Sequence, residues 1–294
     1  MKLVTYDAGG RPRSGVMCGN CVVDLEMASE GGIPGDMVGL LSQEGALERV
    51  REIHARGSED LGSLPAAACG AIAPKLLLAP VLRPGKICCL GLNYGRHAAE
   101  GGAKPPDEPI IFSKAPTSVI GPGRPIVLPE VSKKVDYEVE LGVVIGRRAK
   151  LVSEADAMDC VAGYCVLNDV SARDYQLEKA GGQWYLGKSF DTFCPLGPWM
   201  VTKDDVPDPH ALSLECEVSG EVLQSSSTSE MLFSVPAIIA YLSRVFTLEP
   251  GDVIGTGTPS GVGYACKPPR YLRPGDVVRC TVEGIGTLEN PVEG

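Results

Sequence analysis

The chain has 294 residues, of which 44% are hydrophobic and 22% charged, and its formal net charge is −10 at pH 7. This length allows one large or two smaller hydrophobic cores. The acidic charge argues against nucleic acid as a partner, because phosphate backbones are bound by basic surfaces. No apolar stretch approaches the roughly 20 residues that span a bilayer. The first residues carry neither a secretory signal nor an Arg-rich transit segment. We therefore expect a soluble, cytoplasmic protein with no membrane partner.

The first part of the chain predicts a small N-terminal domain. Residues 2–6 and 21–25 have the pattern of short strands, and residues 36–53 have that of a helix. Closely spaced prolines mark residues 66–84 as an extended connection. The expected organisation is a domain of residues 1–65, a linker of residues 66–84 and a larger catalytic unit of residues 85–294.

The eleven cysteines are expected to be reduced thiols. Several lie within apolar runs, as buried cysteines of a cytosolic protein do. Cys18 and Cys21 have the spacing of a metal or redox pair. No second Cys or His pair lies at a fitting distance, so we expect neither zinc nor redox chemistry there.

His97 is the best placed of the three histidines for proton transfer. His54 and His210 fall in a charged helix and a Pro-rich loop, both expected at the surface. Glu100 follows His97 by three residues, so on a helix the two side chains are neighbours. A carboxylate beside an imidazole raises its basicity and fixes its tautomer, as a general base requires. From these residues alone, a surface ion pair is the alternative.

Two glutamates lie inside an apolar run that predicts a strand. Val139 and Leu141 alternate with polar residues within 135–145, so Glu138 and Glu140 point to the same face. Two half-buried carboxylates so close together repel each other unless a cation lies between them. Their oxygen ligands suit Mg²⁺, Mn²⁺ or Ca²⁺. The alternative is a strand face open to water.

Asp169 is the candidate third ligand. It ends a second apolar run, residues 160–169, at the mouth of a predicted buried strand. Three carboxylates leave room on an octahedral ion for waters and a chelating substrate. The alternative is that Asp169 caps a helix that begins at Val170.

Further elements complete a β-rich α+β chain. Lys188, in an apolar context, is expected either to extend to water or to pair with the carboxylates. Residues 255–259 lack the Gly-Lys-Ser/Thr ending of a phosphate loop, which argues against nucleotide binding. Their exposed N–H groups and the Thr258 hydroxyl would instead bind a substrate carboxylate. A helix is predicted at 234–246, and two Pro-Gly-Asp turns each precede a strand.

Five segments together resemble the fumarylacetoacetate hydrolase family. They occur in the family's order across about residues 85–294, so the resemblance is more specific than any one motif. The chain is most similar to the short members: acylpyruvate and 2,4-dioxo acid hydrolases, and oxaloacetate decarboxylases or tautomerases. The segments are residues 91–100, 136–146, 168–174, 187–193 and 255–263.

The resemblance implies a mixed β-sheet roll with a small N-terminal domain, usually paired as a homodimer. It implies Mg²⁺ or Mn²⁺ bound by Glu138, Glu140 and Asp169. His97 and Glu100 would be the catalytic pair, with Lys188 stabilising developing negative charge. From the residues alone, two of the implied substrate contacts, at 173 and 176, fit an exposed helix face equally well. The implied substrate contacts are Tyr94, Arg173, Gln176, Gly257 and Thr258.

The function implied is chemistry on a small anionic 2-oxo acid. We expect a hydrolase that cleaves the bond between carbons 3 and 4 of a 2,4-dioxo acid, such as an acylpyruvate or a sugar-derived dioxo acid. His97 would activate water, and the reaction would pass through a pyruvate enolate at the metal site. The alternative is an oxaloacetate decarboxylase or keto–enol tautomerase, since these share an enolate. A non-catalytic metal-binding protein is a third alternative, which the presence of His97 and Glu100 disfavours.

Overall fold

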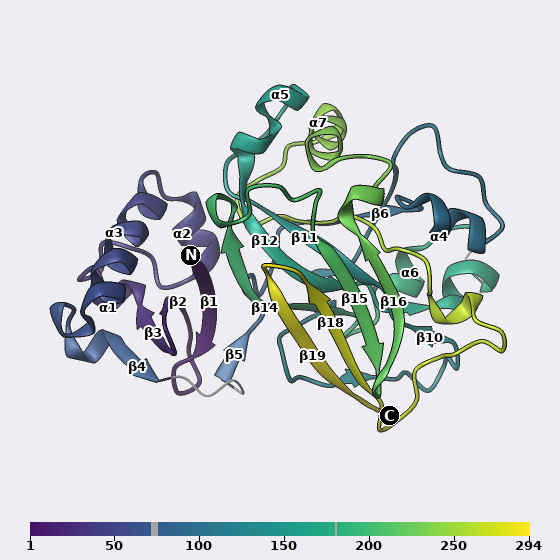
Figure 1. The fold of residues 1–294 in the computed structure, drawn as a ribbon, viewed down its shortest axis with the longest axis horizontal. Coiled ribbons are helices and arrows are strands. Elements are labelled where there is room, and N and C mark those ends of the chain that lie inside the picture. Colours follow the sequence, from purple (N-terminus) through teal and green to yellow (C-terminus); the bar gives the residue numbers. More distant parts are fainter. Residues whose placement is uncertain (72–75, 180) are drawn as a thin grey trace.

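The structure is a computed structural model that describes residues 1–71, 76–179 and 181–294 (Figure 1). Within these residues, twelve strands join one long mixed sheet. The central strands β11 and β12 are buried along their whole length, as expected for apolar runs covered on both faces. The path through the sheet is β4 (Cys69–Ala71), β3 (Cys21–Asp24), β2 (Pro12–Cys18), β1 (Lys2–Asp7), β14 (Cys194–Thr202), β12 (Val161–Asn168), β11 (Val139–Ile145), β17 (Val253–Gly255), β6 (Ile87–Gly91) and β7 (Ile110–Ser113), with β5 (Leu77–Leu78) on β1 and β8 (Val119–Ile120) on β14.

A second sheet packs against the middle of the first. Figure 1 shows its long strands crossing in front of β11, β12 and β14, and the two sheets are in contact there. Alternating residues of β15 and β18 enter the shared core. The predicted Pro-Gly-Asp turns do precede strands, with Gly251 and Gly275 at positive φ. The members, in order, are β16 (Glu221–Ser227), β15 (Ser213–Val218), β18 (Val277–Val282), β19 (Gly286–Glu293) and β9 (Ile126–Val127).

Helices lie at the ends and outer faces of the sheets. The predicted helix at 234–246 is confirmed as α7, which Ser234 caps through the Ala237 N–H. The predicted helix at 36–53 is two helices, because Gly45 adopts a left-handed conformation (φ 71°) between them. The helices are α1 (Leu25–Ala28), α2 (Met37–Ser42), α3 (Ala46–Glu59), α4 (Gly95–Glu100), α5 (Glu154–Ala157), α6 (Tyr185–Lys188) and α7 (Val235–Val245).

The N-terminal part is continuous with the larger sheet. β1 pairs with β14, and Leu3 and Val50 share a hydrophobic core with Val144 and Leu196. Within the predicted linker, β4 pairs with β3 and β5 pairs with β1, whereas residues 72–75 lie outside the described residues. The boundaries at 65 and 85 stay predictions.

The strand predicted over residues 135–145 is interrupted. β10 (Val135–Asp136) leaves the main sheet to pair with β13 (Ser171–Ala172), and β11 begins at Val139. The Asp136 carboxylate accepts the backbone N–H groups of Gly263 and Tyr264, which holds β10 toward the C-terminal loop. Glu138 therefore lies in the two-residue connection between β10 and β11 rather than inside a strand.

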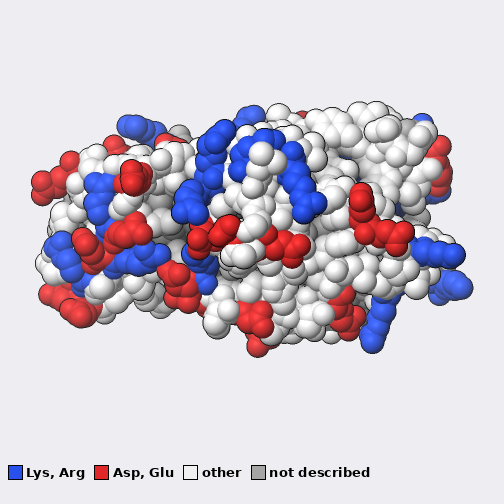
Figure 2. Space-filling model, turned by 90° about the horizontal axis from the view of Figure 1, so that it is seen from above, with Lys and Arg blue, Asp and Glu red and all other residues white. Residues whose placement is uncertain are grey.

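The surface carries mixed charge. On the face shown in Figure 2, basic and acidic side chains are interleaved. Arg147 and Arg148, for example, face Asp159 and Glu249 at 3.8 and 3.6 Å. Among the described residues, no helix is long and apolar enough to cross a membrane.

Candidate active site

The three predicted metal ligands meet where two neighbouring strands adjoin. Glu138 lies just before β11, Glu140 is its second residue, and Asp169 directly follows β12. These strands pair antiparallel, with Glu140 opposite Leu167, so the start of one adjoins the end of the other. One oxygen from each carboxylate lies within 4.8 Å of the other two, and all three side chains are buried. The wet-strand alternative is therefore wrong, and so is the helix cap at Asp169, because β13 follows that residue.

Two buried lysines hold the carboxylates. Lys188 Nζ lies 2.7 Å from Glu138 Oε2 and 2.6 Å from Asp169 Oδ2, so this lysine pairs with the cluster rather than extending to water. Lys114 Nζ binds the other oxygen of Asp169 and lies 3.1 Å from the carbonyl oxygen of Val170. Asp169 is thus fixed through both oxygens, which sets the direction of its carboxylate.

Arg173 joins three side chains of the site. It donates from Nε to Asp136 (2.8 Å), and from its terminal nitrogens to Glu138 (2.6 Å) and Gln176 (2.8 Å). Arg173 and Gln176 are both buried, so the exposed-helix alternative is wrong. The residues from Asp174 to Lys179 form a π-helical turn, which brings Gln176 beside the guanidinium.

The carboxylates differ in their electrostatic environment. Burial raises the pKa of Glu138, but the charges of Arg173 and Lys188 outweigh it and hold that pKa well below its ordinary value. Burial beside Asp169 and Glu138 raises the pKa of Glu140 well above its ordinary value. Among the described residues, the Oε1 atom of Glu140 has no hydrogen-bond partner. A buried carboxylate oxygen without a partner, among three clustered carboxylates, fits a hard divalent cation.

His97 and Glu100 form the predicted pair on α4. His97 Nδ1 lies 2.8 Å from Glu100 Oε1, and Glu100 Oε2 accepts the N–H of Gly261 at 2.9 Å. Because a carboxylate accepts hydrogen bonds, we assign the proton to Nδ1, which leaves Nε2 as the basic nitrogen. His97 is buried and lines a cavity, so the surface-pair alternative is wrong.

That cavity, of about 200 Å³, is lined by one candidate from the metal ligands and several from the catalytic and binding residues, whereas Glu140 and Asp169 do not line it. It is smaller than the roughly 300–1,000 Å³ of typical ligand pockets, so it suits a compact molecule. Its polar lining consists of His97, Glu138, Arg173, Gln176, Lys188, Thr258 and Tyr264. Its apolar lining consists of Leu90, Leu92, Ala103, Phe112, Leu177 and Trp184.

Three of the predicted substrate contacts lie near Glu140, and two of them, Gly257 and Thr258, make hydrogen bonds that support the ligand strand. Gly257 donates its N–H to Glu140 Oε2 at 3.1 Å, and the Thr258 hydroxyl donates to the carbonyl of Val139 at 2.9 Å. The Tyr94 hydroxyl is buried without a hydrogen-bond partner among the described residues, and burial next to Glu140 raises its pKa. Of the three, Thr258 reaches the cavity wall, and their binding of substrate stays a prediction.

Several residues of the site were not identified from the sequence. Lys114 directly follows an apolar strand, as Asp169 does, and that placement was an available signal. Gln224 is buried on β16. It accepts the Val139 N–H at 3.0 Å and donates to Thr258 Oγ1 at 2.8 Å and to the Pro259 carbonyl at 2.9 Å. No local pattern marks this glutamine, because its partners come from distant segments.

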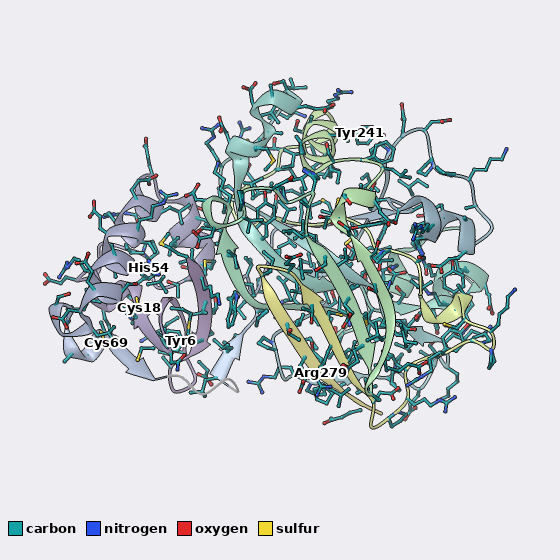
Figure 3. All side chains as sticks on the ribbon, in the orientation of Figure 1. Tyr6, Cys18, His54, Cys69, Tyr241 and Arg279 are labelled. Carbon is teal, nitrogen blue, oxygen red and sulfur yellow. The ribbon has the colours of Figure 1, made fainter. Side chains whose placement is uncertain are left out.

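Other candidate features lie elsewhere. A larger cavity of about 660 Å³ separates α2 and α3 from the end of β11, and none of the predicted site residues lines it. Figure 3 shows His54, Cys18 and Cys69 in the N-terminal part of the molecule, and all eleven cysteines are free thiols. In the described part of the chain, the one close group of three metal-type ligands is the carboxylate cluster.

Comparison with known proteins identifies relatives along the whole chain. Residues 86–293 match the model of the fumarylacetoacetate (FAA) hydrolase C-terminal family. The mitochondrial oxaloacetate tautomerase fahd2 of Xenopus laevis is 54% identical over 216 residues, 74% of this chain and 68% of that protein. The mitochondrial oxaloacetate tautomerase FAHD2A of Bos taurus is 48% identical over 297 residues, 99% of this chain and 91% of that protein. The cytoplasmic location expected for this chain stays a prediction.

Solved structures share the fold. The fumarylacetoacetate hydrolase of Exiguobacterium antarcticum superposes with a TM-score of 0.82 at 37% identity, covering 100% of this chain and 99% of that one. The maleylpyruvate hydrolase of Sphingobium sp. SYK-6, in complex with manganese(II) and pyruvate, gives a TM-score of 0.78 at 30% identity with the same coverage. The predicted family and β-rich α+β fold are confirmed. The chain is an enzyme of the fumarylacetoacetate hydrolase family.

Proposed function

We propose that this enzyme is a divalent-metal-dependent oxaloacetate keto–enol tautomerase. The observation that carries the proposal is that His97, oriented by Glu100, lines the same compact cavity as Glu138, Arg173 and Lys188. The similarity to oxaloacetate tautomerases along 99% of the chain supports oxaloacetate as the substrate. The dioxo acid hydrolase expected from the sequence becomes the second candidate.

The proposed metal ligands are Glu138, Glu140 and Asp169, and Mg²⁺ or Mn²⁺ fits their oxygen donors. When bound there, the ion would supply a Lewis acid that lowers the free energy of negative charge on the 2-oxo oxygen. The buried Oε1 atom of Glu140, which has no hydrogen-bond partner in the described part of the chain, supports this assignment. The manganese and pyruvate complex of a related hydrolase supports the class of metal and substrate.

The chain's own residues would move one proton. His97 Nε2 takes a proton from carbon 3 of the keto acid, while Glu100 stabilises the imidazolium through Nδ1. Lys188, at the polar end of the cavity, offsets negative charge on the oxygen at carbon 2. His97 then returns the proton to that oxygen, which gives the enol. Atoms balance without water or any other reactant.

Hydrolysis of a 2,4-dioxo acid uses the same groups in another way. His97 would take the proton from water, which attacks the 4-oxo carbon, and cleavage of the bond between carbons 3 and 4 would release pyruvate and a carboxylic acid. The likeness to maleylpyruvate hydrolase favours this second candidate. Decarboxylation of oxaloacetate would give pyruvate and carbon dioxide, with no proton transfer from carbon 3.

A proton NMR time course distinguishes the three reactions. The protein is mixed with one of three substrates: oxaloacetate enriched in the enol, acetylpyruvate or maleylpyruvate. Each mixture is measured once in the presence of Mg²⁺ and once in the presence of a chelator. We expect faster loss of the enol vinyl signal with Mg²⁺, and no pyruvate above the uncatalysed background. Pyruvate and acetate from acetylpyruvate, with no acceleration of the enol signal, would refute the tautomerase and establish the hydrolase.

A further inference from the structure

We infer that Trp184 forms the end wall of the active-site cavity and restricts the enzyme to short 2-oxo acids. The inference rests on the proposed function, because it takes this cavity as the site of a 2-oxo acid. It concerns the length of the group that the substrate carries beyond carbon 3.

The cavity has a polar end and an apolar end, joined by a row of contacts. Lys188 Nζ, which binds Glu138, lies 4.9 Å from the centre of the Phe112 ring. The Phe112 ring in turn meets the Trp184 indole edge to face, with 5.4 Å between centroids and an interplanar angle of 62°. Along this wall Trp184 is therefore two contacts away from Lys188 and three away from the carboxylate cluster.

The indole packs against Gly91, and a hydrogen bond restrains the backbone that carries it. A Cβ atom added to Gly91 would lie 2.3 Å from Cζ3 and 2.7 Å from Cη2 of Trp184, so the ring occupies the space that the glycine leaves open. The Trp184 carbonyl accepts the N–H of Lys188 at 3.1 Å, which fixes its backbone to the turn that carries this lysine. A ring so held acts as a wall of fixed position.

Because the cavity is small, the position of the Trp184 indole limits the length of substrate that it can hold. With the 2-oxo acid group at the polar end, a four-carbon diacid fits within about 200 Å³, whereas a long acyl chain or a phenyl group meets the indole. Steric discrimination in an apolar pocket amounts to roughly 10–200-fold for one methylene. The expected substrates are therefore short 2-oxo acids, and aryl or long-chain acylpyruvates are excluded.

The test measures binding, so it does not depend on which reaction the enzyme performs. Titration calorimetry on the Mg²⁺-loaded protein compares Kd for oxaloacetate with Kd for benzoylpyruvate in wild type, Trp184→Ala and Trp184→Phe. The control is Trp199→Phe, at the second of the two tryptophans, whose indole binds the Ile285 carbonyl away from the cavity.

We expect Trp184→Ala to shift the ratio of the two Kd values at least about tenfold toward benzoylpyruvate. Trp184→Phe should shift it less in the same direction, and Trp199→Phe should keep the wild-type ratio. Should the alanine variant fail to fold, the phenylalanine variant decides the question. Ratios within about threefold of wild type in the folded Trp184 variants would overturn the inference. Wild-type protein that binds oxaloacetate without enolising it would refute the proposed tautomerase alone.

Discussion

Replacing Gln224 with leucine should weaken metal binding at a site that Gln224 does not touch. Its amide accepts the N–H of Val139, the residue between Glu138 and Glu140, and donates to Thr258 and Pro259. Thr258 donates in turn to the Val139 carbonyl. Both backbone groups of Val139 are therefore fixed by this network, and with them the spacing of the two carboxylates.

The size of the effect follows from the bonds lost. Leucine would leave the Val139 N–H and the Pro259 carbonyl buried without this partner, at about 1–3 kcal/mol each. The apolar burial of leucine offsets about 1.5–3 kcal/mol. A net loss of about 1–3 kcal/mol in the free energy of unfolding is expected. Substitution of residues that orient metal ligands typically lowers metal affinity by about 10–100-fold, and we expect Gln224→Leu to lower Mn²⁺ affinity by a factor in this range.

Asn290→Leu is the matched control. Asn290 is also a buried amide, on β19, and it donates to the carbonyl oxygens of Gly121 and Arg124 at 3.0 and 2.8 Å. Its replacement should cost similar stability in denaturant unfolding and leave Mn²⁺ affinity, measured by calorimetry, at the wild-type value. Gln224→Glu can still accept a hydrogen bond from the Val139 N–H, so its Mn²⁺ affinity should lie between those of wild type and Gln224→Leu. Equal Mn²⁺ affinity in wild type and Gln224→Leu, despite a loss of stability, would refute the positioning role.

Four further predictions concern the metal ligands, the base and the shared core. Glu140→Gln should weaken Mn²⁺ binding in calorimetry, and undiminished affinity would contradict the ligand assignment. In protein freed of metal by a chelator, the pKa of Glu140 is higher in the folded than in the unfolded state, where it is about 4.5. The contribution of Glu140 to the stability of the metal-free fold is therefore complete below about pH 4.5 and is lost as the pH rises. The stabilisation by Mg²⁺ in thermal unfolding should therefore grow from pH 4.5 to 7, and a constant difference would refute this. His97→Ala should lower the enolisation rate about 10²–10⁴-fold at unchanged Mn²⁺ affinity, and a smaller loss would remove His97 as the base. A fragment of residues 85–294 should be unfolded by circular dichroism, because it lacks the β1 partner of β14; a folded fragment would support the predicted boundary.

The metal cluster could be predicted because its signals are local. The spacing of Glu138 and Glu140 and the position of Asp169 at the end of an apolar run are visible in short windows of sequence. The interruption of the strand at Glu138 could not be predicted, because it depends on the pairing of β10 with β13 rather than on the residues of the strand. The division of the predicted helix at 36–53 has a local cause instead, because Gly45 is visible in the sequence and adopts a left-handed conformation.

The partners of residues that act across the fold could not be predicted from sequence patterns. Lys114 and Asp169 are 55 residues apart, and Gln224 and Val139 are 85 apart. Lys114 follows β7, which lies in the large sheet because β6 and β7 extend that sheet beyond β17. Gln224 lies on β16, which belongs to the second sheet that packs on the first. Lys114 resembles any lysine after a strand until the sheet order is known. Its burial then shows that it is paired.

The charge of the buried cluster explains how so acidic a chain can bind an anion. Within the buried group around the proposed ligands, which leaves out the Glu100 carboxylate paired with His97, four carboxylates (Asp136, Glu138, Glu140 and Asp169) face three cations (Lys114, Lys188 and Arg173), a formal net charge of −1. The cations bind three of those carboxylates, so the uncompensated charge is that of Glu140. With a divalent ion on the proposed ligands, the cluster changes from −1 to +1. A dianion such as oxaloacetate would then be attracted to the cluster rather than repelled, so we expect the metal to bind before the substrate.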